Sequence, residues 1–259
     1  MRIALGIEYE GTRYAGWQYQ HHAPSVQQAV ERAVSKVADE PVRVVCAGRT
    51  DTGVHALAQV VHFDTGAERT ARSWVLGCNS NLPEDVCVRW AQPVDDEFHA
   101  RFEALARRYR YLILNRPTRP ALLRHRVCWH HPPLDAARMA AGARPLVGEH
   151  DFSSFRALAC QAKHPVRTVH ELSVQRHGEC VVIDVSANAF LHHMVRNIAG
   201  VLIAIGEGGR PPEWSEHLIR ARDRSIGGVT APPGGLYLVS VQYPDRFGLP
   251  APPQPPLYS

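Results

Sequence analysis

Hydrophobic and polar positions change period several times along the first hundred residues. Alternation over residues 2–10 predicts a strand. Residues 25–39 predict a helix, because apolar positions recur there at helical spacing and Ser25 with Gln28 forms a capping-box pattern. The remaining elements expected in this half are strands at 42–46, 56–63 and 86–91 and a helix around 70–79.

The second half repeats this order more loosely. Strand-like patterns lie at 108–115, 126–131, 166–176, 180–187 and 236–242, and helical patterns at 135–145, 190–205 and 213–222. The β-α-β-β-α-β order of the first half is ferredoxin-like. We therefore expect an α+β fold of two pseudo-symmetric, ferredoxin-like halves with mainly antiparallel sheets. The expected boundaries are 1–104, 105–243 and an extended, proline-rich tail at 244–259.

Composition narrows the functional classes. Of 259 residues 45% are hydrophobic, and no apolar run reaches the length of a membrane span or of a signal-peptide core, so a cytoplasmic protein without membrane contact is expected. The six cysteines form no C-x-x-C pair, so the sequence indicates neither a zinc ribbon nor a redox motif. Adjacent histidine pairs such as His192-His193 lack chelating spacing, so no metal is expected either.

Positive charge is concentrated in one segment. The net charge is only +4, yet residues 107–126 contain seven arginines and no acidic residue, with Tyr109 and Tyr111 among them. Arginine binds phosphate oxygens in a bidentate way, so this segment favours nucleic-acid contact. A solvated basic face is the alternative.

A single carboxylate occupies a glycine-flanked loop at residues 46–56. Gly48 and Gly53 allow a sharp bend around Asp51, and Arg49 favours the ionised acid. Such an anion suits a nucleophile better than a proton donor. A turn aspartate that caps a backbone N–H is the structural alternative, but the two predicted core strands on either side favour a site.

This loop resembles the active-site motif of the tRNA pseudouridine synthase A family, in which Ala is commoner at the position of Thr52. Further matching segments follow in the family's order: 3–12 with 16–18, 98–102, 107–111, 151–155, 189–197 and 235–239. The resemblance implies the pseudouridine synthase fold and an isomerase that uses no cofactor and no metal. It also implies tRNA as partner and a homodimer as the working form.

The resemblance assigns roles to particular residues. Asp51 corresponds to the catalytic carboxylate, Tyr109 to a tyrosine that lies over the target uracil, and Arg196 to an arginine that pairs with the carboxylate. Arg49 would flip the base or contact phosphate. The basic strand residues Arg107, Arg108 and Arg110, with Tyr109, are the expected substrate-binding side chains. From the residues alone, Tyr109 also fits a core aromatic and Arg196 a solvated helix residue. On the predicted helix, Arg196 shares a face with His192, His193 and Gly200.

The family isomerises uridine to pseudouridine at positions 38, 39 and 40 of the tRNA anticodon stem-loop. The sequence leaves open whether Asp51 acts at C1′, at C2′ or at C6 of the uridine. One rival is an aspartic protease, because Asp51-Thr52-Gly53 recurs at 64–66; two copies thirteen residues apart cannot supply two lobes. The other is a non-catalytic RNA-binding module of paired ferredoxin-like halves.

Overall fold

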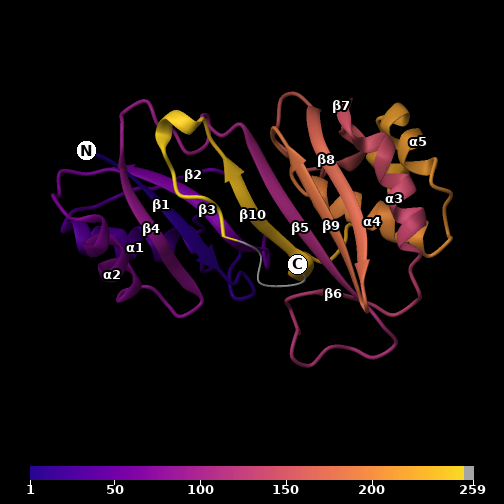
Figure 1. The fold of residues 1–259 in the computed structure, drawn as a ribbon, viewed down its shortest axis with the longest axis horizontal. Helices are drawn as coiled ribbons and strands as arrows, with labels where there is room; N and C mark the ends of the chain where they lie inside the picture. Colours follow the sequence, from indigo (N-terminus) through magenta and orange to yellow (C-terminus); the bar gives the residue numbers. More distant parts are fainter. Residues whose placement is uncertain (254–259) are drawn as a thin grey trace. The chain divides into compact units, whose positions relative to one another are not determined.

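Two groups of strands and helices, each with its own core, make up residues 1–253, the part of the chain that the computed structural model describes (Figure 1). The first unit consists of Met1–Arg107 together with the described residues from Tyr237 onward. The second unit is the continuous stretch Arg108–Leu236. The expected division at 104 and 243 remains a prediction; contacts group the last strand with the first unit.

The first unit contains strands in the order β4-β1-β3-β10, with β2 paired to β3 off this path. They are β1 (Arg2–Tyr9), β3 (His55–Asp64), β4 (Val86–Val94) and β10 (Leu236–Gln242). Strand β1 is antiparallel to both β3 and β4. The short β2 (Val45–Cys46) pairs with β3 opposite Val61 and His62, and β10 runs parallel to β3 with Tyr237 opposite His55. The strand β10 thus uses a part of β3 that β2 leaves unpaired.

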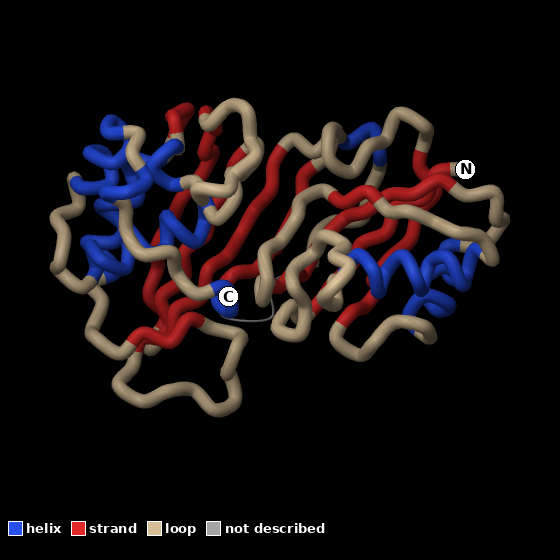
Figure 2. The backbone as a smooth tube through the Cα atoms, turned by 180° about the vertical axis from the view of Figure 1, so that it is seen from behind, coloured by secondary structure: helices blue, strands red, loops and turns tan. Residues whose placement is uncertain are grey.

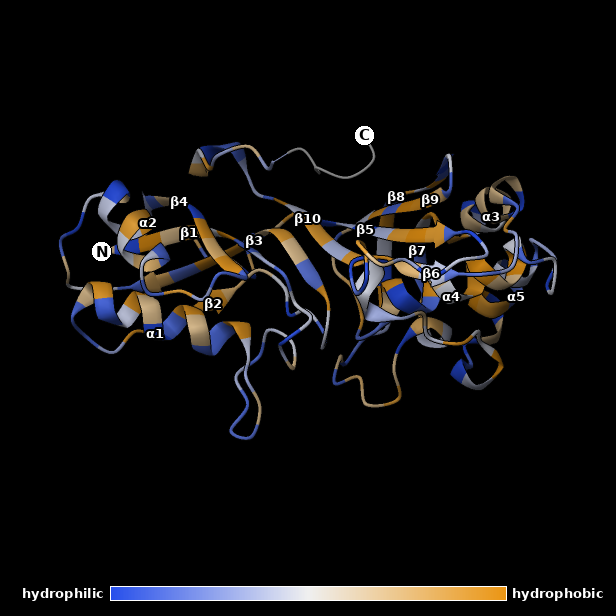
Figure 3. Cartoon of the chain, turned by 90° about the horizontal axis from the view of Figure 1, so that it is seen from below, coloured by the Kyte–Doolittle hydropathy of each residue, from blue (hydrophilic) through white to orange (hydrophobic). Residues whose placement is uncertain are grey.

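Helices and a C-terminal segment lie on opposite sides of these strands (Figure 3). Helix α1 (Val26–Ala38) begins where the Ser25 hydroxyl accepts the Gln28 N–H, as the sequence predicts, and α2 (Ala71–Asn79) begins at Thr70 in the same way. On the other side, Phe98, Tyr243 and Phe247 form an aromatic core cluster with Ala4 and Val60.

The prediction of an extended C-terminal tail is partly wrong. Residues Asp245–Phe247 form a short 3-10 turn, and Phe247 is buried against Phe98 with ring centroids 5.1 Å apart. The apolar ring anchors this segment because burying it removes a large hydrophobic area from water. The last six residues of the predicted tail lie outside the described part of the chain.

The second unit contains strands in the order β5-β9-β8-β7, with helices beside them (Figure 2). The strands are β5 (Ala106–Asn115), β7 (Gly148–Asp151), β8 (Val166–His177) and β9 (Cys180–Ala187), and β6 (Cys128–His130) pairs with β5. The helices are α3 (Ala136–Ala143), α4 (Met194–Gly206) and α5 (Trp214–Ala221). Four 3-10 turns lie at Arg144–Leu146, Ser153–Phe155, Arg224–Ile226 and Pro233–Gly235.

The predicted α+β class with mainly antiparallel strands is confirmed, and the differences are local. Helix α4 begins at Met194 rather than at residue 190, because His193 has a left-handed backbone (φ 62°). Strand β7 was missed because Gly-Glu-His-Asp shows no apolar alternation. No helix within residues 1–253 has the length and apolar character needed to cross a bilayer.

Candidate active site

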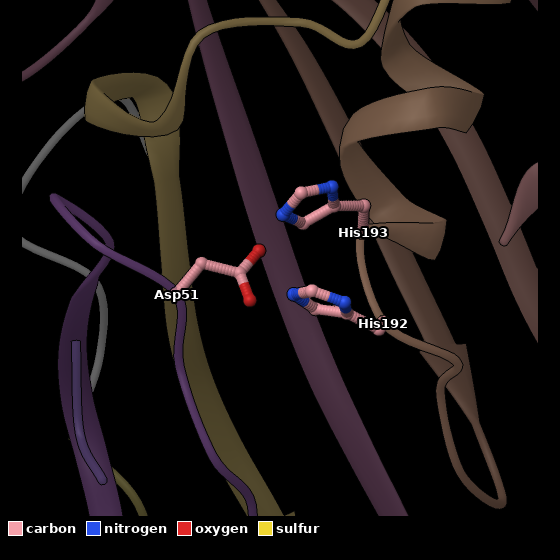
Figure 4. Close-up of side chains that lie close together, drawn as sticks. All are labelled: Asp51, His192 and His193. Atoms are coloured by element: carbon pink, nitrogen blue, oxygen red, sulfur yellow. The ribbon is translucent and has the colours of Figure 1, made fainter. Parts of the chain in front are cut away.

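Asp51 projects from the turn that joins β2 to β3 and is half-buried (Figure 4). Main-chain hydrogen bonds fix this turn. The Trp17 N–H donates to the Thr50 carbonyl (3.0 Å), and the Val54 N–H donates to the Asp51 carbonyl (3.1 Å). Gly53 has φ +75°, the conformation that favours glycine, whereas Gly48 does not adopt a positive φ. Of the two glycines expected to bend the loop, only Gly53 uses a left-handed backbone.

Two buried polar side chains, Gln59 and Tyr9, form hydrogen bonds with the residues on either side of Arg49. The Gln59 amide, fully buried on β3, donates to the Gly48 carbonyl (2.6 Å) and accepts the Gly48 N–H (3.4 Å). The Tyr9 hydroxyl lies 2.8 Å from the Thr50 hydroxyl. Because these side chains come from β3 and β1, the loop is attached to the sheet on both sides of Arg49.

Neighbouring glycines allow backbone to pack directly on the loop. Gly16 has φ +94°, and a Cβ there would lie 2.6 Å from the Thr50 carbonyl oxygen and 3.0 Å from the Asp51 carbonyl carbon. A Cβ at Gly11 would lie 2.0 Å from the Val54 carbonyl oxygen. The segment around Gly11–Gly16 therefore forms a wall behind Asp51 that tolerates no side chain at these two positions.

The arginines of the first unit have different environments. Arg49 is exposed. Arg107, expected to contact substrate, is instead buried, and its guanidinium donates to the carbonyls of Ala47 (3.0 Å), Arg101 (2.5 Å) and Ala104 (3.0 Å). These bonds give Arg107 a structural task beside the Asp51 loop, because buried charge requires such partners.

A cysteine precedes the loop but is not suited to nucleophilic attack. Burial raises the pKa of the Cys46 thiol to about 12, although the nearby Arg49 and Arg101 act to lower it. Because the thiolate is the reactive form, this group stays protonated and inert near neutral pH.

Tyr109 lies on β5 in the second unit and is 7% exposed. Phe190 packs against it edge-to-face, with ring centroids 5.0 Å apart at 83°. The tyrosine ring is therefore held in a defined orientation by an aromatic neighbour from the segment before α4.

The strand arginines on either side of Tyr109 form ion pairs. Arg110 contacts Asp184 of β9 through Nε (3.1 Å) and Nη2 (2.9 Å). Arg108 lies 3.3 Å from Glu171 and 3.7 Å from Asp184. Residues 107–126 contain no acid of their own, but carboxylates of β8 and β9 pair with the arginines of β5. These pairs reduce the net positive charge around this part of the strand.

Arg196 lies in the first turn of α4 and is tied to the loop at residues 227–231. Its Nε donates to the Ala231 carbonyl (2.8 Å), and the Ala231 N–H donates to the Arg196 carbonyl (3.1 Å). Close packing brings the loop here, because a Cβ at Gly200 would lie 1.8 Å from the Val229 carbonyl oxygen.

Polar side chains around Asn197 complete this attachment. The Thr230 hydroxyl donates to Asn197 Oδ1 (2.7 Å), and Arg224 Nη2 donates to the same oxygen (3.1 Å). The Asn197 amide donates to the Phe155 carbonyl (2.7 Å). Sequence reasoning missed this network, although the adjacent glycines Gly227 and Gly228 are a sequence signal of close backbone approach.

His192 and His193, which the sequence places on one helical face with Arg196, in fact precede the helix (Figure 4). Their rings lie 4.0 Å apart at 42°. The expected shared face is wrong because the left-handed His193 stops the helix from extending toward its N-terminus.

The predicted site residues are thus divided between the two units. Asp51, Arg49 and Arg107 belong to the first, and Tyr109, Arg196, Arg108 and Arg110 to the second. Hydrogen bonds or aromatic packing support the Asp51 loop, Arg107, Tyr109 and Arg196. Such support is typical of residues whose orientation matters for chemistry.

The Asp51 loop thus lies in an α+β fold with mainly antiparallel strands and is held by buried hydrogen bonds. The sequence profile of the family described as tRNA pseudouridine synthase matches residues 6–103 and 143–244. The chain belongs to the tRNA pseudouridine synthase family, whose members are isomerases.

Relatives resemble the chain over almost its whole length. It is 61% identical over 250 residues to tRNA pseudouridine synthase A of Nitrosococcus oceani, covering 96% of each chain. It is 61% identical over 250 residues to the protein of the same name from Pseudomonas aeruginosa, covering 96% of this chain and 88% of the relative. The Vibrio cholerae protein of that name is 57% identical over 258 residues, covering 100% and 98%.

Proposed function

We propose that this protein isomerises uridine to pseudouridine at positions 38, 39 and 40 of the tRNA anticodon stem-loop. The observation that carries the proposal is the Asp51 loop in a chain of this family: it carries a half-buried carboxylate, and its neighbouring residues are held by Gln59, Tyr9 and close glycine packing. The names of the relatives support tRNA as the substrate.

The reaction breaks the N1–C1′ bond of a uridine and joins C5 to C1′. Uracil then carries a proton on N1 and has lost one from C5, so the overall change is an isomerisation without redox chemistry. In the proposed mechanism Asp51 is the anion that acts at C1′, at C2′ or at C6. A preformed loop supports this role, because a fixed carboxylate needs no reorganisation when charge develops.

The other site residues are proposed on the basis of their motifs. Tyr109 lies over the uracil and its hydroxyl helps to remove the C5 proton, while Arg196 pairs with the carboxylate and favours its ionised form. The packing of Tyr109 against Phe190 and the bond from Arg196 to Ala231 support defined orientations for both.

Binding of tRNA is proposed to involve exposed basic side chains. Arg49 is exposed next to Asp51 and is suited to hold a flipped nucleotide or a phosphate. Arg108 and Arg110 would contact RNA only together with their acidic neighbours. We further propose that the protein acts in the cytoplasm as a homodimer.

Pseudouridine mapping tests the proposal. An unmodified tRNA transcript with uridines at 38, 39 and 40 is incubated with wild type or with Asp51→Asn, and tRNA affinity is measured for both. Product with wild type only, at equal affinity, is the expected result. Product with both enzymes would remove Asp51 from the chemistry. Binding without product by wild type would instead favour a non-catalytic RNA-binding module.

A further inference from the structure

Phe102 is a large aromatic side chain on the surface of the first unit. It is 73% exposed and lies in the turn between β4 and β5. The His99 ring stacks on it with centroids 4.3 Å apart at 24°, and the Arg101 guanidinium lies 5.6 Å from its centroid. A single exposed apolar residue is ordinary, but a ring that is backed by a second ring and accompanied by a cation is a more specific arrangement.

The turn that carries this ring is rigid. His99 Nδ1 accepts the N–H groups of both Arg101 (3.2 Å) and Phe102 (3.1 Å), and the Glu103 N–H donates to the His99 carbonyl (3.0 Å). The preceding Phe98 is fully buried. The exposed ring is thus presented in a fixed position, which lowers the entropy cost of binding a partner.

This turn is joined to the catalytic loop through Arg107. The Arg107 guanidinium donates to the carbonyls of Arg101 and Ala104 on one side and of Ala47 on the other. Ala47 is four residues before Asp51. The buried arginine therefore fixes the position of the Phe102 turn relative to the strand that leads into the site.

A cation, Arg101, lies beside Phe102 within a segment of mixed charge. Arg101 and Arg49 are both exposed, and both act to lower the pKa of the same Cys46 thiol. The same segment also carries acids: Glu97 and Glu103 share Arg246, which lies 3.0 Å and 3.3 Å from them, and Asp95 and Asp96 are exposed. Arg101 and Arg49 are the exposed groups here that can contact a phosphate oxygen.

We infer that Phe102, backed by His99 and accompanied by Arg101, is a stacking platform for an unpaired base of the RNA substrate, distinct from the base that reacts. The inference rests on the proposed function. Exposed aromatic faces bind unpaired bases by stacking, and arginine supplies a contact to the adjoining phosphate. The platform would hold a nucleotide near the target uridine while that uridine leaves its stack.

Substitutions at Phe102 test the platform. Phe102→Ala is compared with Phe102→Trp, which keeps a stacking face, and with Leu76→Ala, which removes an exposed apolar side chain from α2 of the same unit. We expect Phe102→Ala to raise the tRNA Kd and KM about tenfold, with kcat changed less than about threefold and no change in the salt dependence of Kd. Phe102→Trp restores both constants, and Leu76→Ala leaves them unchanged.

The tryptophan variant also gives a direct reading. Stacking of a base on the new indole quenches its fluorescence, measured as the difference from wild type when tRNA is added. Unchanged Kd for Phe102→Ala, an equal loss in the Ala and Trp variants, or no added quenching overturns the inference. A different result would refute the proposed function and leave the platform intact. In that case, wild type binds tRNA but makes no pseudouridine, and the Phe102→Trp variant still shows quenching.

Discussion

Replacing Gly16 by Ala is expected to displace the Asp51 loop. The new Cβ would lie 2.6 Å from the Thr50 carbonyl oxygen, whereas ordinary contacts begin at 3.4 Å, so the two backbones must separate by about 0.8 Å. The atoms that must give way belong to Thr50, Asp51 and Thr52. Because misplacement of about 1 Å can lower a rate about 100-fold, we expect kcat to fall by roughly that factor.

The matched control is Gly208→Ala. Gly208 also has a positive φ (+83°), but a Cβ there meets nothing within 4 Å. Both variants bear the left-handed backbone cost of about 1–2 kcal/mol in the free energy of unfolding, and only Gly16→Ala adds the overlap with the loop.

The assay combines single-turnover pseudouridine formation with urea unfolding. Gly16→Ala should be folded at low urea and bind tRNA, yet react slowly, while Gly208→Ala should react at the wild-type rate. If both variants react within twofold of one another, the position of the Asp51 loop does not depend on the glycine wall, and the reasoning fails.

Three further outcomes are expected. Gln59→Leu leaves both main-chain groups of Gly48 without their buried partner, so the free energy of unfolding in urea should fall by about 2–4 kcal/mol. Thr230→Val removes a bond beside the Arg196 attachment and should lower kcat about tenfold at unchanged Kd for tRNA, with Thr230→Ser restoring it; equal defects would refute a role of the hydroxyl. Burial, and to a smaller extent the nearby His99, lowers the pKa of His62 in the folded chain to about 4, so between pH 6.5 and 4 the unfolded chain binds the proton more readily. The free energy of unfolding should therefore be highest above pH 6.5 and fall by at most about 3 kcal/mol as the pH decreases toward 4. Urea unfolding of His62→Gln over the same pH range should not show this fall.

The sequence predicts most elements because their local signals agree with their surroundings. Ser25 and Thr70 cap the helices that their patterns place after them, and the strand periods of β1, β3 and β9 match the observed ranges. The Asp51 turn was found because glycine, arginine and aspartate stand next to one another between two strands. These signals lie within a few residues of the features that they predict.

Features set by distant partners were not predictable. The seven arginines of residues 107–126 indicated a solvated or RNA-binding surface, but Arg107 is buried on main-chain carbonyls and Arg110 is paired with Asp184, 74 residues away. The attachment of Arg196 to Ala231 likewise joins segments 35 residues apart. Composition within a window cannot reveal neighbours that only the fold brings together.

Strand β10 completes the first unit, although it comes after the whole second unit in the chain. The unit that carries Asp51 needs Tyr237, whose ring stacks on His55 at 4.7 Å, and this residue leaves the ribosome only after all of Arg108–Leu236 has been made. Until then the His55–Ala56 edge of β3 lacks its parallel neighbour. A chain whose translation stops before Tyr237 therefore leaves this strand edge unpaired, and an unpaired edge can pair with another chain.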